Sequence, residues 1–218
     1  MSLKQEIARY CRKVYEQGFT AATDGNLSVR FSGNITLITR SGISKGDVEE
    51  KDIIACDPDG NVVMGNGRAS TEIKLHQYIY KKRKEINAVI HCHPVYATAF
   101  AVTGKTLDVP VFPEVILTLG RIPLCRYATP STEALAESLS PYIDYANVFL
   151  LENHGAVSVG KNLKEAFYRM EKLEHYAKSL SVAHSLGGVK ELSRENLREL
   201  YAAAEKVYGI KLHEKNKF

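Results

Sequence analysis

Two histidines separated by one residue end an apolar segment of the chain. The sequence AVIHCH, residues 88–93, predicts a buried strand that ends with His91 and His93. Because side chains alternate across a strand, both imidazoles should point to one face and Cys92 to the other. His154 comes at the end of a second apolar run, in ENHG. Three neutral nitrogen ligands leave a metal ion one open position, so these residues predict a catalytic zinc site. The alternative for His91 and His93 alone is a hydrogen-bonded pair at a strand end.

The remaining histidines and the cysteines do not add ligands. The histidines that lie on predicted helices or in the C-terminal tail are His76, His175, His184 and His213. The four cysteines are scattered and include no C-x-x-C pair, so neither a zinc ribbon nor a disulfide framework is expected. They are interpreted as reduced thiols.

Polar residues at predicted turns could bind an anion. Ser70, Thr71 and Glu72 begin a predicted helix, whose free backbone amides and dipole favour a phosphate. A plain helix cap is the simpler interpretation of this stretch alone. Two glycine-containing turns, DGNLS at 24–28 and TRSG at 39–42, have the composition of further anion-binding corners. The sequence contains neither a Walker loop nor a dinucleotide-binding fingerprint, which argues against nucleotide-dependent chemistry.

Strands mixed with helices must position these residues. Hydrophobic spacing and turn residues predict strands over 26–31, 34–40, 53–56, 61–64, 88–93, 147–155 and 156–160. Helices are predicted over 4–18, about 71–84, from Pro94, and over about 130–139, 162–187 and 193–207. The segment with Pro110, Pro113 and Gly120 is expected to be a loop. No linker or repeat divides the chain, so residues 1–218 are expected to form a single α/β domain.

Composition limits the possible partners and compartment. The 218 residues are 44% hydrophobic and carry 29 basic and 25 acidic side chains, a formal charge of +4. This excess is too small to indicate binding to nucleic acid or to a membrane. The N-terminus lacks the apolar core of a signal peptide, and no apolar run is long enough to span a bilayer. We expect a cytoplasmic protein.

The order of the motifs resembles the class II aldolase and adducin superfamily. The motifs are T-D-G-N-L-S, I-T-R-S-G, S-T-E, H-C-H-P, Y-A-T-P and E-N-H-G, spread over about residues 7–210. They are most similar to the L-fuculose-1-phosphate aldolase branch. The resemblance implies a three-layer α/β/α fold with a central mixed or antiparallel sheet, and a homotetramer with active sites between neighbouring subunits. It also implies one zinc ion per subunit.

Site residues follow from the resemblance motif by motif. The zinc ligands would be His91, His93 and His154, with Glu72 beside the metal as an occasional ligand and proton shuttle. Tyr208, from a neighbouring subunit, would exchange a proton with an oxygen of the substrate. The residues that would hold the substrate phosphate are Asn26, Ser41, Gly42, Ser70 and Thr71.

One position departs from the aldolase pattern. Glu114 stands where the aldolase prototype carries a tyrosine from the adjacent subunit. A carboxylate there could orient a different aldehyde or act as a general base, as an acid does in the superfamily's methylthioribulose-phosphate dehydratases. The alternative is a glutamate that caps a helix or lies in a subunit interface.

The implied activity is reversible cleavage of a ketose 1-phosphate, either L-fuculose 1-phosphate or a related deoxypentulose 1-phosphate. The products would be dihydroxyacetone phosphate and an aldehyde, formed through a metal-stabilised enediolate. Other members of the superfamily are methylthioribulose-1-phosphate dehydratases, pentulose-5-phosphate 4-epimerases, decarboxylases and non-catalytic adducin-like binding modules, which remain alternatives. Schiff-base chemistry at Lys45 or Lys74 is a further alternative, although nothing in the sequence predicts a desolvated pocket around either lysine.

Overall fold

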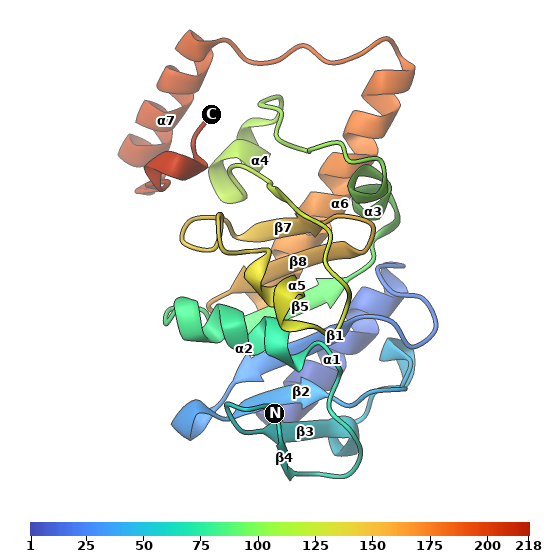
Figure 1. The fold of residues 1–218 in the computed structure, drawn as a ribbon. Coiled ribbons are helices and arrows are strands. Elements are labelled where there is room, and N and C mark those ends of the chain that lie inside the picture. Colours follow the sequence, from blue (N-terminus) through green and yellow to red (C-terminus); the bar gives the residue numbers. More distant parts are fainter.

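Eight strands form one sheet in the computed structural model, which describes residues 1–218 (Figure 1). The strands are β1 Asn26–Arg30, β2 Thr36–Thr39, β3 Ile53–Cys56, β4 Val62–Met64, β5 Ala88–Cys92, β6 Leu124–Cys125, β7 Val148–Leu151 and β8 Gly155–Gly160. Their order across the sheet is β4-β3-β2-β1-β5-β8-β7-β6. Neighbouring strands pair antiparallel except β6 and β7, which are parallel. The sheet is therefore mixed, as expected.

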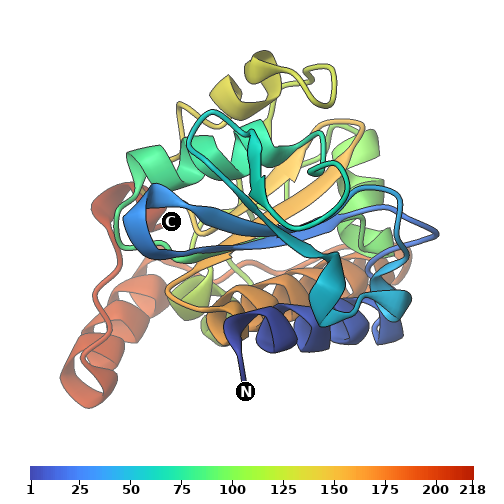
Figure 2. The same ribbon diagram turned by 90° about the horizontal axis from the view of Figure 1, so that it is seen from below.

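Helices cover both faces of this sheet. The helices are α1 Leu3–Glu16, α2 Ile73–Lys82, α3 Val95–Val102, α4 Pro113–Thr118, α5 Glu133–Glu137, α6 Leu163–Ser185 and α7 Arg194–Tyr208. Figure 2 shows α1 and α6 along one face and α2 and α5 along the other. The prediction of a three-layer α/β/α fold is confirmed.

Alternation along β5 divides the core between the two faces. Ile90 and Cys92 belong to the larger hydrophobic cluster, which includes the buried sides of α1, α3 and α6. Val89, one residue away, belongs to the second cluster, which includes Leu75 and Ile79 of α2. Because His91 lies two residues after Val89, the strand directs it to the α2 face. Cys92 faces the other way, as the alternation predicted.

The best-predicted helices have capping residues at their ends. The side chain of Asn162 accepts a hydrogen bond from the backbone of Glu165 at the start of α6. Ser193 and Asn196 form a reciprocal capping box at the start of α7. Gly209 ends α7 in the left-handed conformation, which glycine adopts without a Cβ clash.

Two sequence expectations for local structure were wrong. Helix α2 begins at Ile73, because residues 70–72 form a turn in which the Ile73 N–H donates to the Ser70 carbonyl. Neither Ser70 nor Thr71 is therefore the cap residue. The expected loop around Pro113 contains helix α4, in which Pro113 occupies the first turn and Val115 and Ile116 are buried.

The C-terminal part of the chain extends away from the sheet. In Figure 1 an extended segment after α6 leads to α7, which lies beside α4 and not against the sheet.

None of the helices combines the length and the apolar character that crossing a membrane would need.

Candidate active site

Two adjacent strands bring the three histidines together. His91 is the fourth residue of β5, and His93 follows the end of that strand. β5 pairs with β8, and His154 lies in the tight turn between β7 and β8. The turn holds Asn153 at a φ of 55°, in the left-handed region that asparagine tolerates. One nitrogen from each imidazole lies within 4.8 Å of the others.

The imidazoles all direct their Nε2 atoms into the cluster. His91 Nδ1 donates to the carbonyl of Ala156 at 3.0 Å, so its Nε2 points into the cluster. The Nε2 atoms of His91 and His93 are 3.1 Å apart. His93 Nδ1 points outward, 3.6 Å from a carboxylate oxygen of Asp24. Outer partners of this kind fix the orientation and tautomer of metal-binding histidines.

Glu72 completes the cluster from the turn before α2. Its Oε2 lies 3.1 Å from His91 Nε2, and its Oε1 lies 3.2 Å from His154 Nε2. The Nδ2 of Asn26 donates to Oε2 at 2.8 Å. Glu72 is buried, so these contacts are its main source of stabilisation.

The cluster favours an ionised carboxylate and neutral imidazoles. Burial alone would raise the pKa of Glu72, but the electrostatic interaction with the adjacent His91 and the hydrogen bonds from His154 and Asn26 lower it well below its usual range. Burial lowers the pKa of His91 to about 4, against the opposing effect of Glu72. Burial also lowers the pKa of His93. Neutral imidazole and ionised carboxylate are the forms that bind a metal.

This donor set fits a divalent metal ion. Three imidazole nitrogens and a carboxylate converge, and nitrogen-rich sites of this kind suit zinc and other late transition metals. The Nδ1 of His154 is buried without a hydrogen-bond partner in the chain, so its Nε2 is the nitrogen directed at the cluster. Cys92 belongs to the core on the opposite face and is not part of this set.

The structure places the predicted phosphate-binding residues at the same end of the sheet. Asn26, at the start of β1, pairs with His91 in the sheet. Ser41 N–H donates to the Arg68 carbonyl at 2.9 Å, which brings the Ser41–Gly42 turn beside the segment that leads to Ser70. The Ser70 hydroxyl accepts from the Glu72 N–H at 3.4 Å. Ser70 is buried, whereas Thr71 is exposed. Their role in binding phosphate stays a prediction.

Lys45 joins two of these turns. Its Nζ donates to the carbonyls of Thr23, at 3.1 Å, and Ile43, at 2.8 Å. The residue is 1% exposed, and burial lowers its pKa. The sequence therefore did not predict that Lys45 is buried, because the flanking sequence is polar and gives no sign of burial. Lys74, in contrast, is exposed and pairs with Glu133 at 3.2 Å.

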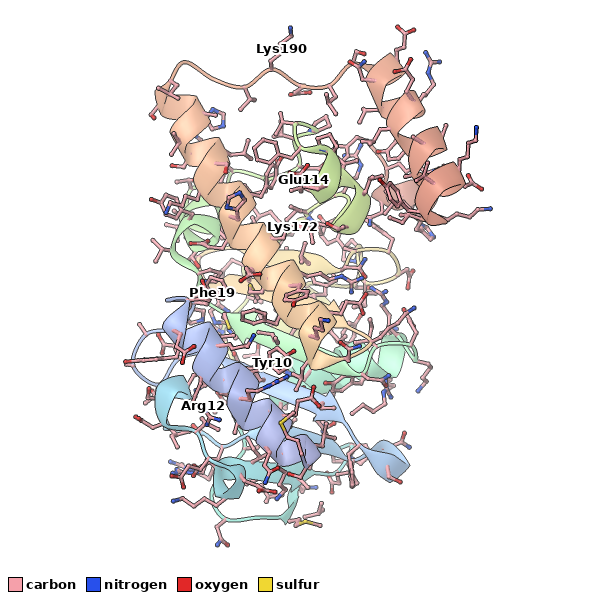
Figure 3. The ribbon with its side chains drawn as sticks, turned by 180° about the vertical axis from the view of Figure 1, so that it is seen from behind. Tyr10, Arg12, Phe19, Glu114, Lys172 and Lys190 are labelled. Carbon is pink, nitrogen blue, oxygen red and sulfur yellow. The ribbon has the colours of Figure 1, made fainter.

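Glu114 and Tyr208 do not join the cluster within the chain. Glu114 is exposed in the first turn of α4, and its carbonyl accepts from Lys172 of α6 at 3.4 Å (Figure 3). Its carboxylate has no hydrogen bond or ion pair within the chain. Tyr208 ends α7 and is 72% exposed, so its side chain is available to a neighbouring molecule.

The sequence analysis missed two residues around the cluster. His76 is fully buried on α2 and contacts Asn26, and Asp24 faces His93. His76 follows Glu72 by four residues, and helical spacing directs residues four apart to the same side, so the spacing could have indicated that His76 lies near the cluster.

Comparison with known proteins defines the class. Residues 5–180 match the family described as the Class II Aldolase and Adducin N-terminal domain, and the chain belongs to this family. Aldolases of this class depend on a metal ion, and the histidine cluster can hold one.

Three relatives with named activities are similar to this chain over most of its length. The L-fuculose phosphate aldolase of Methanococcus maripaludis is 34% identical over 181 residues, which cover 83% of this chain and 97% of the relative. The 5-deoxy-D-ribulose 1-phosphate aldolase of Bacillus thuringiensis is 31% identical, with 90% and 92% covered. The 3-oxo-tetronate 4-phosphate decarboxylase of Haemophilus influenzae is 33% identical, with 82% and 86% covered.

A solved structure agrees with the relatives. An L-fuculose 1-phosphate aldolase superposes with a TM-score of 0.84 and 35% sequence identity, covering 94% of this chain and 95% of that one. With several relatives named as aldolases, the chain is a class II aldolase, an enzyme of the carbon–carbon lyase class.

Proposed function

We propose that the chain is a zinc-dependent aldolase that reversibly cleaves a ketose 1-phosphate into dihydroxyacetone phosphate and an aldehyde. The substrate would be L-fuculose 1-phosphate or a related deoxypentulose 1-phosphate, as in the named relatives. The observation that carries the proposal is the cluster of three imidazoles in which the Nε2 atoms of His91 and His154 lie 3.1 and 3.2 Å from the carboxylate of Glu72, and the Nε2 of His93 lies 3.1 Å from that of His91. That arrangement joins a Lewis-acid site to a proton-transfer group.

Zinc held by His91, His93 and His154 would supply Lewis-acid stabilisation of the negative charge that develops on the substrate oxygens. Glu72 would return a proton to the carbon that loses its bond to the aldehyde. Its Oε2 accepts a hydrogen bond from Asn26, whereas the His154 Nε2 that faces Oε1 would be a metal ligand, so Oε1 is the oxygen that we expect to carry this proton.

The phosphate would be held by backbone amides and short polar side chains. The residues are Asn26, Ser41, Gly42, Ser70 and Thr71. Gly42 has a φ of +76°, and no other group lies within 4 Å of where a Cβ would be, which leaves its backbone open to an anion. Asn26 donates one amide hydrogen to Glu72 and keeps a second one for the substrate.

A neighbouring subunit would complete the site. We propose a homotetramer in which Tyr208 enters the site of the next subunit and exchanges a proton with a substrate oxygen. Glu114, exposed on α4 with a carboxylate free of contacts in its own chain, would act at the aldehyde end of such a site. Residues 1–218 would act as one domain within this assembly.

The test is an assay of several ketose 1-phosphates for release of dihydroxyacetone phosphate, with metal removed and restored. We expect cleavage of at least one 6-deoxy or 5-deoxy ketose 1-phosphate, loss of activity after chelation, and recovery with zinc. Full activity of the metal-free protein would contradict the proposal, as would trapping of a substrate adduct by borohydride.

A decarboxylase is the second candidate, because one relative with this activity is 33% identical. Both reactions leave a carbanion equivalent that the same cluster could stabilise and protonate. Carbon dioxide release from a 3-oxo acid phosphate, without cleavage of any ketose 1-phosphate, would favour this candidate. A dehydratase would form a diketone and no triose phosphate, and an epimerase would leave the carbon chain intact.

A further inference from the structure

A buried chain of hydrogen bonds runs from Glu72 into the interior between α2 and the sheet. Asn26 Nδ2 donates to Glu72 Oε2, and Asn26 Oδ1 lies 2.5 Å from His76 Nε2. His76 Nδ1 lies 2.6 Å from the Ser28 hydroxyl, which lies 2.7 Å from the hydroxyl of Tyr80. All members of the chain are less than 9% exposed.

The carboxylate of Glu72, at one end of the chain, determines which group donates and which accepts in every hydrogen bond. An ionised carboxylate only accepts, so Asn26 must present its Nδ2 to Glu72 and its Oδ1 to His76. An amide oxygen also only accepts, so the proton of His76 is on Nε2. In a neutral imidazole Nδ1 then accepts from Ser28, and Ser28 accepts from Tyr80.

The surroundings of His76 keep it neutral. Ser28 and Asn26 contact its two ring nitrogens and are uncharged, and the neutral hydroxyl of Tyr80 contacts Ser28. Glu72 and His91 lie beyond Asn26. Burial lowers the pKa of His76 to about 3, so the imidazole remains uncharged at neutral pH. One tautomer is therefore selected.

We propose that His76 is a positioning residue for proton transfer by Glu72. By donating from Nε2 to Asn26 Oδ1, it holds the Asn26 amide in the orientation that binds Glu72 Oε2 and leaves Oε1 for the substrate. The inference rests on the proposed function, in which Glu72 moves a proton. Ser28 and Tyr80 act at the far end, where they keep the proton of His76 on Nε2.

Two matched variants separate this role from simple packing. The amide nitrogen of glutamine in His76→Gln can occupy the position of Nε2 and keep the bond to Asn26. The shorter His76→Asn can replace only Nδ1, so it keeps the contact with Ser28 and loses the contact with Asn26. Both variants are polar amides in the same buried position, so loss of the imidazole is common to both.

Zinc affinity and turnover are the readouts. For His76→Asn we expect a zinc dissociation constant raised about tenfold or more, the usual consequence of losing a residue that supports a metal ligand. We expect kcat to fall by about tenfold or more, with KM changed less. For His76→Gln both quantities should stay within about threefold of the wild type. Equal behaviour of the two variants would overturn the proposal.

A second measurement, made on the wild-type protein, needs no known substrate. Nitrogen-15 NMR of labelled histidine, with His76→Gln to assign the signal, should show a protonated Nε2 and an unprotonated Nδ1. A proton on Nδ1 would overturn the proposal. If no ketose 1-phosphate is cleaved, the proposed function fails, while zinc affinity and the tautomer still decide whether His76 holds Asn26.

Discussion

Glu72 could bind a metal ion together with the histidines around it, and these histidines also affect its ionisation. Its two oxygens lie 3.1 and 3.2 Å from His91 and His154, close enough to share a metal ion with them. The same carboxylate is kept ionised by these neighbours and by Asn26, so it can accept a proton from the substrate. A variant that removes the charge of Glu72 and keeps its shape separates its contribution to metal binding from its contribution to proton transfer.

Glu72→Gln should still bind zinc, although more weakly, because the three histidines remain. Turnover should fall by about two orders of magnitude or more, since an amide cannot accept and return a proton. Metal analysis and the dihydroxyacetone phosphate assay measure the two effects. The comparison variant His93→Ala should lose zinc and activity together, and retention of both would refute the ligand assignment.

Strands β5 and β8 approach each other so closely at Gly155 that no side chain fits there beside His93. A Cβ on Gly155, the first residue of β8, would lie 2.5 Å from His93 Cδ2 and 2.7 Å from the Cys92 carbonyl oxygen. The ring of His93 would have to move to relieve the first clash, and the second would strain the pairing of β5 with β8. The glycine therefore determines how the two strands present their ligands.

Gly155→Ala should accordingly raise the zinc dissociation constant by about tenfold or more, a typical result of disturbing a metal ligand's surroundings. Gly160→Ala, at the other end of β8, is the matched control, because its Cβ would lie 2.6 Å from the Ala166 backbone nitrogen. That control should lower the melting temperature and leave zinc affinity unchanged. Equal zinc affinity in both variants would contradict this account.

Lys45 is the connection between the turns before β1 and after β2. Lys45→Met removes its hydrogen bonds to Thr23 and Ile43. We expect KM for the ketose 1-phosphate to rise about tenfold, or about 1.4 kcal/mol, because the phosphate-binding turns separate. Zinc affinity should not change. The exposed Lys74→Met serves as control and should leave KM unaltered, and an unchanged KM in both variants would show that Lys45 has no such role.

Sequence reasoning succeeded where a local signal was present. Asn162 and Ser193 are capping residues, and both helices begin where these predict. Helix α4 was missed because its six residues are too few to show a helical period and begin with a proline. The contacts that Lys45 makes with Thr23 and that His76 makes with Asn26 had no local signal, since these partners lie 22 and 50 residues away in the sequence.

At the scale of the whole molecule, α7 has few contacts with the rest of its own chain. It lies beside α4 and ends in Tyr208, which is exposed (Figure 1). A helix held in this way is suited to contribute a residue to an adjacent copy. In a closed ring, each site would then combine Glu72 of one subunit with Tyr208 of the next.

Mixing two inactive variants tests this arrangement. Glu72→Gln and Tyr208→Phe should each be nearly inactive alone. After the two are unfolded, mixed in equal amounts and refolded, roughly a quarter of the sites in randomly assembled rings should contain both native residues. Turnover should recover to about that fraction of the wild type. No recovery in mixed oligomers, verified by mass spectrometry, would place Tyr208 outside the neighbouring site.

The pairing of β5 with β8 also determines when the metal site can form during folding. His91 Nδ1 binds the carbonyl of Ala156, 65 residues later in the chain, and His154 reaches the cluster through the same pairing. Contacts of such sequence separation form late, because the intervening chain must first be ordered. We therefore expect metal capture to follow completion of the central strands, so that the ion stabilises the finished sheet instead of nucleating it.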